Sequence, residues 1–194
     1  MDGKQSGSRA GDAESSRILP LICHPDTPCG ADVRLSVAVD RGMQGALGLR
    51  YRVEGDVEKL IWPSPAPPAR ADGLWQAGCL ELFVRDARHA DRYREHNFAP
   101  SRAWAAYDFS GYRAGMDNAD MPAPDIAPLP GEGRFDLAVH LHLPTDDAVM
   151  IGLSAVVQER GGAISYWALA HPPGKPDFHH PACFACELPP PRPS

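Results

Sequence analysis

The fold is decided by residues 134–143, which read RFDLAVHLHL. Large apolar side chains occupy every second position from Phe135 to Leu143, and polar or small residues stand between them. Successive side chains of an extended strand point to opposite faces. This pattern therefore predicts a strand with one face on a core and the other toward water.

The same alternation recurs on both sides of this stretch, in residues 33–39, 47–53 and 80–85. Residues 148–157 (AVMIGLSAVV) and 163–170 (AISYWALA) are apolar enough to predict strands that are buried on both faces. Turn signals separate these segments, at residues 54–56, 63–68, 131–133 and 160–162. The last of them, Arg-Gly-Gly, predicts a hairpin between its two neighbouring strands.

Breaker residues are dense, with 21 Pro and 18 Gly among 194 residues, and no helical stripe runs longer than about two turns. The expected fold class is therefore all-β, a single antiparallel β-sandwich of the jelly-roll or immunoglobulin-like kind. The Pro-rich residues 116–130 are expected to form a long irregular loop. Composition predicts a disordered tail over residues 1–17, one domain over 18–188, and a disordered Pro-rich tail over 189–194.

The net charge of −6 argues against sequence-independent binding to nucleic acid or to an anionic membrane surface. No apolar run approaches the roughly 18–20 residues of a membrane span, and residues 1–17 lack the apolar stretch of a secretory signal. A cytoplasmic location is therefore expected. The five cysteines, an odd number, are expected to remain free thiols there. The sequence does not set the oligomeric state.

The middle of the chain carries a linked set of motifs: Trp75, an acid six residues later at Glu81, the Glu95-x-Asn97 strand, and Trp104 with Tyr107. Further on, residues 164–181 read ISYWALAHPPGKPDFHHP. Together these segments resemble the family 9 carbohydrate-binding modules and the related DOMON-like domains, over roughly residues 20–188. The resemblance implies a β-sandwich that binds sugars or, in some DOMON relatives, haem.

Carried over residue by residue, the resemblance implies a sugar site with Trp75 as an aromatic platform and Glu81 as the acid. Trp167 is the expected second aromatic, and Asn97 and Arg102 are expected polar contacts by neighbourhood. Aromatic rings stack on the apolar face of a pyranose, and a carboxylate accepts two hydroxyl donors at once. One departure concerns Cys79, which stands where sugar-binding members commonly carry an acidic residue and weakens a calcium or sugar site.

A purely structural interpretation competes with this site. Trp75, Trp104 and Trp167 are equally compatible with positions in the sandwich core. Glu81 is equally compatible with an ion pair to Arg50 or Arg52 on a neighbouring strand.

The C-terminal part of the chain offers candidate metal ligands, namely His171, His179, His180, Cys183 and Cys186. Cys-x2-Cys is a common half of a zinc site, but the chain has no second such half, so a structural loop is favoured. Haem is a further alternative, with Met116 or Met121 and His171 as axial ligands. It would be bound non-covalently, because the chain has no Cys-x-x-Cys-His motif.

The sequence contains no nucleophile elbow, no phosphate-binding loop and no His-Glu-x-x-His motif. An acid/base enzyme would need two carboxyls from the set Glu81, Glu95 and Asp108 to converge in one cleft. The favoured function is a non-catalytic domain that binds a small ligand, most plausibly a carbohydrate such as an intracellular sugar or glycan precursor.

Overall fold

The computed structural model describes residues 16–76, 78–86 and 91–193, and these residues are mostly strand, with no α-helix. The strands are β1 (Arg17–Cys23), β2 (Val33–Arg41), β3 (Ala46–Gly55), β4 (Ala69–Arg70), β5 (Cys79–Asp86), β6 (Tyr93–Phe98), β7 (Ala103–Phe109), β8 (Asp117–Asn118), β9 (Asp125–Gly131), β10 (Arg134–His142), β11 (Val149–Gln158), β12 (Ile164–Ala168) and β13 (Cys186–Leu188). Short 3-10 helices are η1 (Val57–Lys59), η2 (Leu74–Gln76) and η3 (Pro181–Cys183). The predicted all-β class is confirmed.

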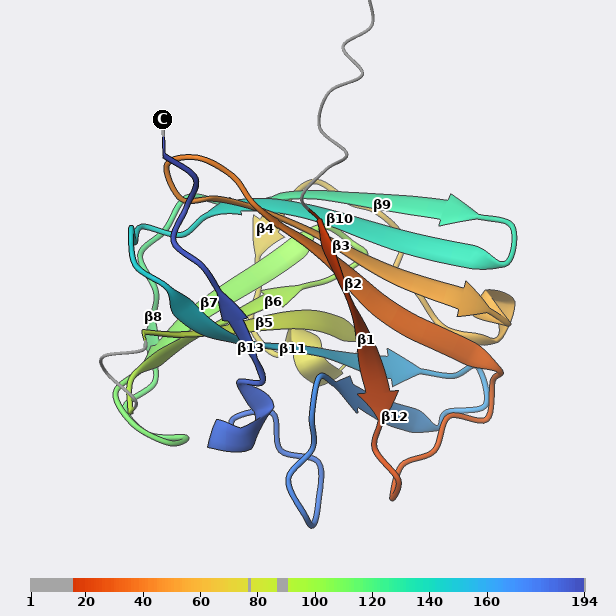
Figure 1. Ribbon diagram of the computed structural model, residues 1–194. Coiled ribbons are helices and arrows are strands. Elements are labelled where there is room, and N and C mark those ends of the chain that lie inside the picture. Colours follow the sequence, from red (N-terminus) through yellow and green to blue (C-terminus); the bar gives the residue numbers. More distant parts are fainter. Residues whose placement is uncertain (1–15, 77, 87–90, 194) are drawn as a thin grey trace, which may run out of the picture.

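The strands form one curled sheet in the order β4-β7-β6-β5-β11-β12-β1-β2-β3-β10-β9. Its two halves face each other as an upper layer (β2, β3, β10, β9) and a lower layer (β7, β6, β5, β11, β12), as Figure 1 shows. Strand β1 joins them, because its residues 17–21 pair with β2 whereas Ile22 and Cys23 pair with β12. The sheet is mixed rather than purely antiparallel, since β4 runs parallel to β7.

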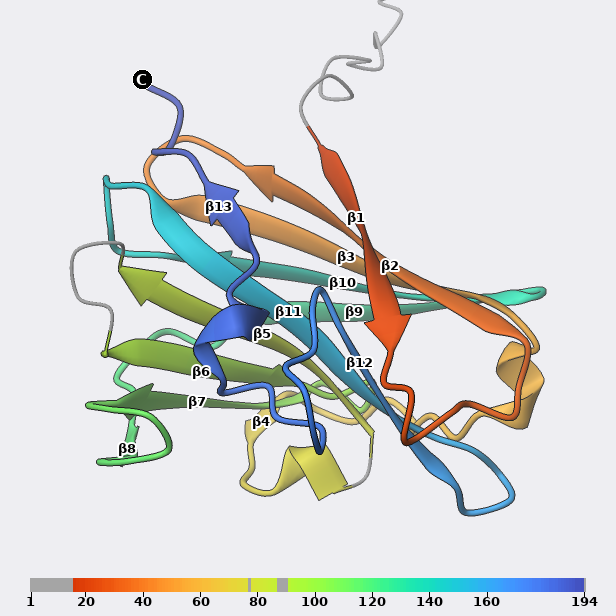
Figure 2. The same cartoon turned by 60° about the horizontal axis from the view of Figure 1, so that its bottom comes forward.

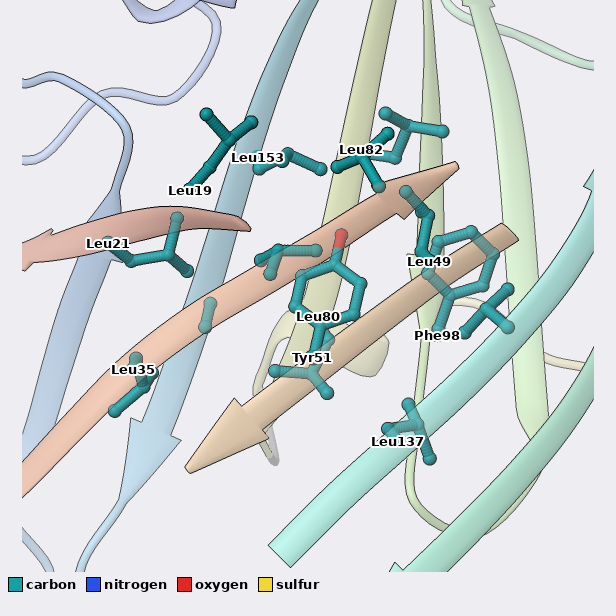
Figure 3. Packing of buried hydrophobic residues seen from close by; sticks show 14 of the residues in the cluster. Leu19, Leu21, Leu35, Leu49, Tyr51, Leu80, Leu82, Phe98, Leu137 and Leu153 are labelled. Carbon is teal, nitrogen blue, oxygen red and sulfur yellow. The ribbon is translucent and has the colours of Figure 1, made fainter. Parts of the chain in front are cut away.

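The main core lies between the two layers. Figure 3 shows side chains of both layers meeting there, with Leu35, Leu49 and Tyr51 from the upper one and Leu80 and Leu153 from the lower one. Each of these residues is buried. All of them except Leu153 come from segments whose apolar side chains alternate in the sequence, and Leu153 comes from β11, which is buried on both faces. The core-facing half of the alternation predicted for residues 33–39, 47–53, 80–85 and 134–143 is therefore confirmed. The opposite face is exposed or half-buried on β2 and β3, as expected, whereas it is buried at Glu81 and Phe83 on β5 and at Asp136 on β10.

The prediction of an irregular loop over residues 116–130 is wrong. Asp117 and Asn118 form β8, and β9 pairs with β10 as the last strand of the upper layer. Pro128 and Pro130 lie within β9. A strand at the edge of a sheet tolerates proline, because one side of that strand has no neighbour and a missing N–H there removes no hydrogen bond. The prolines therefore led to the prediction of a loop where the chain forms a strand.

The ends of the domain also differ from expectation. Residues 1–15 lie outside the described residues, but Arg17, assigned by composition to the disordered tail, begins β1. The tail predicted over residues 189–194 contacts the upper layer over part of its length. The guanidinium of Arg192 lies 2.8 Å from Asp40, and the carbonyl of Pro189 accepts a hydrogen bond from Arg41.

A long connection between β12 and β13 covers part of the outer face of the lower layer; it is drawn in blue in Figures 1 and 2. Its Phe178 and Phe184 form a second apolar cluster with Phe83, Tyr93 and other residues of that face. This cover explains why β11 is buried on both faces, as its composition predicts. Among the described residues, no helix combines the length and the apolar character that a membrane span needs.

Candidate functional site

A cavity of about 920 Å³ opens on the outer face of the lower layer, beside the connection from β12 to β13. Most of its walls come from strands β5, β6, β7, β11 and β12 and from the loops around them. The lining residues are Asp72, Gly73, Trp75, Glu81, Phe83, Glu95, Tyr107, Phe109, Arg113, Met116, Asp117, Asn118, Val156, Tyr166, Pro176, Phe178 and His179. The cavity thus combines aromatic rings with carboxyl groups, the composition expected of a small-ligand site.

Trp75 stands at the rim of this cavity. It lies in η2, which begins after Gly73, a residue with a φ of 71° that a side chain would strain. The Trp75 side chain is 53% exposed, so a large part of its ring is open to solvent in the free protein. A ring held in this way can stack on an incoming ligand without first leaving a packed core.

Glu81 lies on the wall of the cavity because it alternates along β5 with Leu80 and Leu82, which face the main core. Its side chain is only 3% exposed, and its Oε2 accepts a hydrogen bond of 3.0 Å from the Ser154 hydroxyl. Burial, and secondly the nearby Glu95 carboxylate, raise the pKa of Glu81 to about 8. At neutral pH this carboxyl is therefore mostly protonated in the free protein.

Glu95 is the second buried carboxyl of the cavity, on β6 beside β5. Burial raises its pKa as well, and the amide of Asn97 partly opposes this by donating a 2.6 Å hydrogen bond to Glu95 Oε1. The Cys79 thiol in turn donates to Asn97 Oδ1 over 3.2 Å. Cys79, which departs from the family pattern, thus supports the amide that orients Glu95 and adds no further charge, because burial raises the pKa of its thiol.

Tyrosine and histidine side chains complete the polar part of the wall. The Tyr107 hydroxyl donates a 2.6 Å hydrogen bond to Asp72, and burial together with this bond raises the pKa of Tyr107. His179 Nδ1 lies 2.8 Å from the Tyr93 hydroxyl, and its Nε2 lies 3.7 Å from Glu95 Oε2. Burial, and secondly the charge of Arg113, lower the pKa of His179 to about 4, so this imidazole is neutral at pH 7.

Arg113 is the only Lys or Arg among the described residues that line the cavity. Its guanidinium already forms an ion pair of 2.7 Å with Asp177, whose other oxygen accepts from the Tyr112 hydroxyl. Its direct ion pair is therefore with Asp177, and it acts on the Glu95 carboxyl only through space, where its charge opposes the rise of the Glu95 pKa.

The structure brings together some of the site residues predicted from the sequence and separates others. Trp75 and Glu81 share the cavity, and Asn97 lies directly behind it as the partner of Glu95. Trp167 does not join them, because it faces the main core, is 7% exposed and donates to the Ser165 hydroxyl. Arg102 lies in the turn between β6 and β7 and does not line the cavity.

The alternative structural roles are also resolved for particular residues. Trp104 belongs to the main core, as its structural interpretation predicts. Glu81 does not pair with Arg50 or Arg52, because both guanidinium groups lie against Asp136 on the upper layer.

The residues proposed as metal ligands do not gather at one point. Among the described residues, no group of three or more His, Cys, Asp or Glu side chains is placed to hold a metal ion. His180 caps η3 by accepting from the Ala182 amide, Cys183 donates to the carbonyl of Asp177, and Cys186 lies beside Arg17. All five cysteines are free.

The haem ligands considered from the sequence are not brought together either. Met116 lines the cavity, but neither His171 nor Met121 does. His171 Nε2 lies 2.8 Å from the carbonyl of Ile22, to which it donates, so this ring nitrogen is already engaged. The methionine and histidine named from the sequence therefore do not line one cavity.

Several residues of the cavity were not identified from the sequence as binding candidates: Phe83, Phe109, Tyr166, Phe178, His179 as a wall residue, and Asp72. Phe83 could have been found, because period two places it on the face of Glu81. The others come from strands or loops whose position against β5 depends on the pairing order, which the alternation alone does not give.

The fold of the chain is similar to the folds of two solved proteins. The chain resembles the solved structure of a candidate carbohydrate-binding protein from Bacteroides uniformis, at 17% identity and a TM-score of 0.59, over 87% of this chain and 84% of the other. It also resembles a family 9 carbohydrate-binding module from Caldicellulosiruptor kristjanssonii in complex with glucose, at 10% identity and a TM-score of 0.51, over 89% and 84% of the two chains. No family model and no curated protein matches the sequence. At these identities the likeness concerns the fold.

Proposed function

We propose that this chain binds a carbohydrate in the cavity of the lower layer, without transforming it. The observation that carries the proposal is the half-exposed ring of Trp75 at the rim of a cavity that also contains the buried carboxyl of Glu81. A stacking face at the entrance and hydrogen-bonding groups at depth match the two sides of a pyranose ring. The fold likeness to a module solved with glucose supports the same ligand class.

The polar groups of the wall suit a ligand rich in hydroxyls. A protonated carboxyl donates one hydrogen bond and accepts others, so Glu81 and Glu95 together serve both roles. The Asp72–Tyr107 pair adds a further acceptor group near the rim. In this proposal Glu81 and Trp75 make the contacts predicted from the family resemblance, and Tyr166 or Phe178 takes the role of second aromatic in place of Trp167.

The finer labels also belong to this proposal. The family resemblance supports a DOMON-like sandwich of the jelly-roll or immunoglobulin-like kind. The sequence supports a cytoplasmic sugar or glycan precursor as the ligand.

An acid/base enzyme is the second candidate, because Glu81 and Glu95 do converge in one cavity. Hydrolysis of a glycosidic bond uses two carboxyls that flank the bond from different sides. Here both come from adjacent strands of the same wall, β5 and β6, so they face a ligand from one side. Binding is therefore favoured, and incubating the protein with an oligosaccharide and analysing the products by chromatography would reveal any cleavage.

The binding proposal is tested with Trp75→Ala and the control Met43→Ala on a glycan array, followed by calorimetry of any ligand found. Met43 is exposed to a similar extent, 56%, but does not line the cavity. We expect Trp75→Ala to lose glycan binding at least tenfold because a stacking contact is removed, whereas Met43→Ala binds like the wild type. Absence of any glycan ligand for the wild-type protein, or full binding by Trp75→Ala, would contradict the proposal.

A further inference from the structure

The cavity is lined by more acidic groups than basic groups that could compensate them. Four acidic residues line it, Asp72, Glu81, Glu95 and Asp117, against the single cation Arg113, which is already paired with Asp177. A neutral sugar gives such a wall no counter-charge. The excess of acidic groups therefore indicates the charge of the ligand as well as its chemical class.

The imbalance is sharpest at Glu81. Its carboxyl is nine-tenths buried and accepts from the Ser154 hydroxyl, yet among the described residues no Lys or Arg lies within ion-pair distance. The group that acts on it electrostatically is a second carboxyl, Glu95, and the imidazole facing Glu95 is the neutral His179. A buried carboxylate without a cation is unfavourable by several kcal/mol, so it stays protonated until a counter-charge arrives.

The remaining walls of the cavity are aromatic. Rings of Phe83, Tyr107, Phe109, Tyr166 and Phe178 line it together with Trp75. An ammonium group is attracted to the faces of such rings, and more strongly where water is excluded. Aromatic walls around two carboxyls that have no ion pair with Lys or Arg among the described residues are a combination that recognises an organic cation.

We infer that the cavity selects an amino sugar, a carbohydrate whose free amine is protonated and sits against the Glu81–Glu95 pair. This inference rests on the proposed function, since it assumes that the sugar ring stacks on Trp75. It goes further by fixing the charge of the ligand and the group that the carboxyl pair contacts. Acetylation of the amine would remove the charge and enlarge the group, so the N-acetylated sugar is excluded as the preferred ligand.

Proton linkage follows from the same geometry. In the free protein Glu81 is mostly protonated at pH 7, because its pKa is raised to about 8. A bound ammonium favours the ionised carboxylate, so binding of an amine that is already protonated releases a proton from the carboxyl. The amine of a glucosamine unit titrates near neutrality, so this release is complete only at a slightly acidic pH, where the amine is protonated before it binds. The titratable and charged groups around the pair are Glu81 and Cys79 on β5, Glu95 on β6, Tyr107 on β7 with Asp72, Tyr51 of β3 behind Glu81, and Tyr93, Arg113, Asp177 and His179 at the loop side. Because the pKa of Glu81 is raised to about 8, Glu81 is the group that we expect to release the proton.

The test compares three trisaccharides of the same β-1,4 linkage, built from glucose, from glucosamine and from N-acetylglucosamine, by calorimetry at pH 7. We expect the glucosamine trimer to bind at least tenfold more tightly than the glucose trimer, and the N-acetylglucosamine trimer to lose this advantage. Repeating the titration at pH 6 in phosphate and in MES, which differ in ionisation enthalpy, should show up to about one proton released per glucosamine trimer bound, because at this pH the sugar amine is already protonated before binding.

Two variants separate the carboxyl pair from the overall charge of −6. Glu81→Gln should reduce the preference for glucosamine to less than twofold and abolish proton release. Asp125→Asn removes one charge from an exposed position on β9 of the upper layer and should keep both. If Glu81→Gln does not fold, Glu95→Gln provides the same comparison. The three trimers also test the inference on the wild-type protein alone, without any variant.

The outcomes distinguish the two proposals. Equal affinity for the glucose and glucosamine trimers overturns the amino-sugar inference and leaves carbohydrate binding intact. A preference that Asp125→Asn weakens as much as Glu81→Gln also overturns it, because the attraction would then be due to net charge. Failure of all three trimers and of the glycan array overturns both.

Discussion

The two faces of the lower layer are made by the same strands and contain opposite chemistry. On β6, Glu95 faces the cavity, where Asn97 donates to it, whereas the next residue, His96, faces the main core. Neither ring nitrogen of His96 has a hydrogen-bond partner among the described residues. On the cavity face, the buried polar groups of Glu95 and Asn97 are connected by a hydrogen bond. On the core face, the buried imidazole of His96 has no hydrogen bond. Polar groups that are both buried and mutually supported therefore distinguish the cavity face from the core face of this layer.

The largest expected effect separates two tryptophans, one on each face. Trp167→Ala should lower the free energy of unfolding by about 3–5 kcal/mol, because it empties a site in the main core. Trp75→Ala should change it by less than about 0.5 kcal/mol, because that ring is 53% exposed. Urea denaturation followed by circular dichroism measures both. If both variants lost a similar free energy of unfolding, Trp75 would be a core residue like Trp167 and not an exposed stacking platform.

A smaller effect is expected at Glu81 and depends on pH. The folded-state pKa of about 8 lies above the value of 4.5 for an ordinary glutamate, so Glu81 favours the folded state fully below pH 4.5 and progressively less up to pH 8. Glu81→Gln lacks this dependence. The stability of Glu81→Gln relative to wild type should therefore rise between pH 4.5 and 8, by an amount on the order of a few kcal/mol.

Denaturation curves at several pH values measure this difference. Asp125→Asn is the control, because its carboxyl is exposed on β9, and its stability relative to wild type should stay flat over the same range. A flat difference for Glu81→Gln as well would mean that Glu81 is ionised in the folded protein at neutral pH.

The smallest expected effect is a stabilisation on the core face. His96→Met replaces an unsatisfied ring by an apolar side chain of similar size and should raise the free energy of unfolding by about 1–3 kcal/mol at pH 7. Burial lowers the pKa of His96 to about 3, so the wild-type residue supports folding above pH 6.5 and loses this contribution as the pH falls toward 3. The gain in His96→Met should therefore increase at pH 5.

Thermal melts at pH 7 and pH 5 check this prediction. His140→Met, at an exposed position on β10, should change the stability by less than about 0.5 kcal/mol at either pH. A loss of stability in His96→Met would show that the imidazole contributes packing or polar contacts that a thioether cannot replace.

Much of the fold follows from alternation alone. Residues 134–143 and their counterparts form β10, β2, β3 and β5 because a one-sided core requires apolar side chains at every second position. Strand β9 was missed because a strand accepts prolines only at the edge of a sheet. The sequence of a segment does not show whether that segment lies at an edge. Strand β1 was missed because its upstream neighbours have the composition of a disordered tail.

Within the candidate site, the family resemblance predicted Trp75 and Glu81 as binding residues. The alternation along residues 80–85 predicted that Glu81 lies on the face opposite the core. On β12 the same reasoning failed, because residues 163–170 are apolar on both faces and the sequence therefore does not distinguish Tyr166 from Trp167. The register with β11 places Tyr166 opposite Val156, a cavity residue, and turns Trp167 into the core.

The sequence by itself therefore determined which residues alternate, and hence the strands and the class of the fold. Only the tertiary structure decided that Glu81 and Glu95 meet, that the connection between β12 and β13 covers the outer face beside them, and that Arg113 is engaged by Asp177. The physical reason is that alternation arises from a strand's own geometry. A cavity arises from the order in which distant strands pair, and that order depends on interactions across the whole chain.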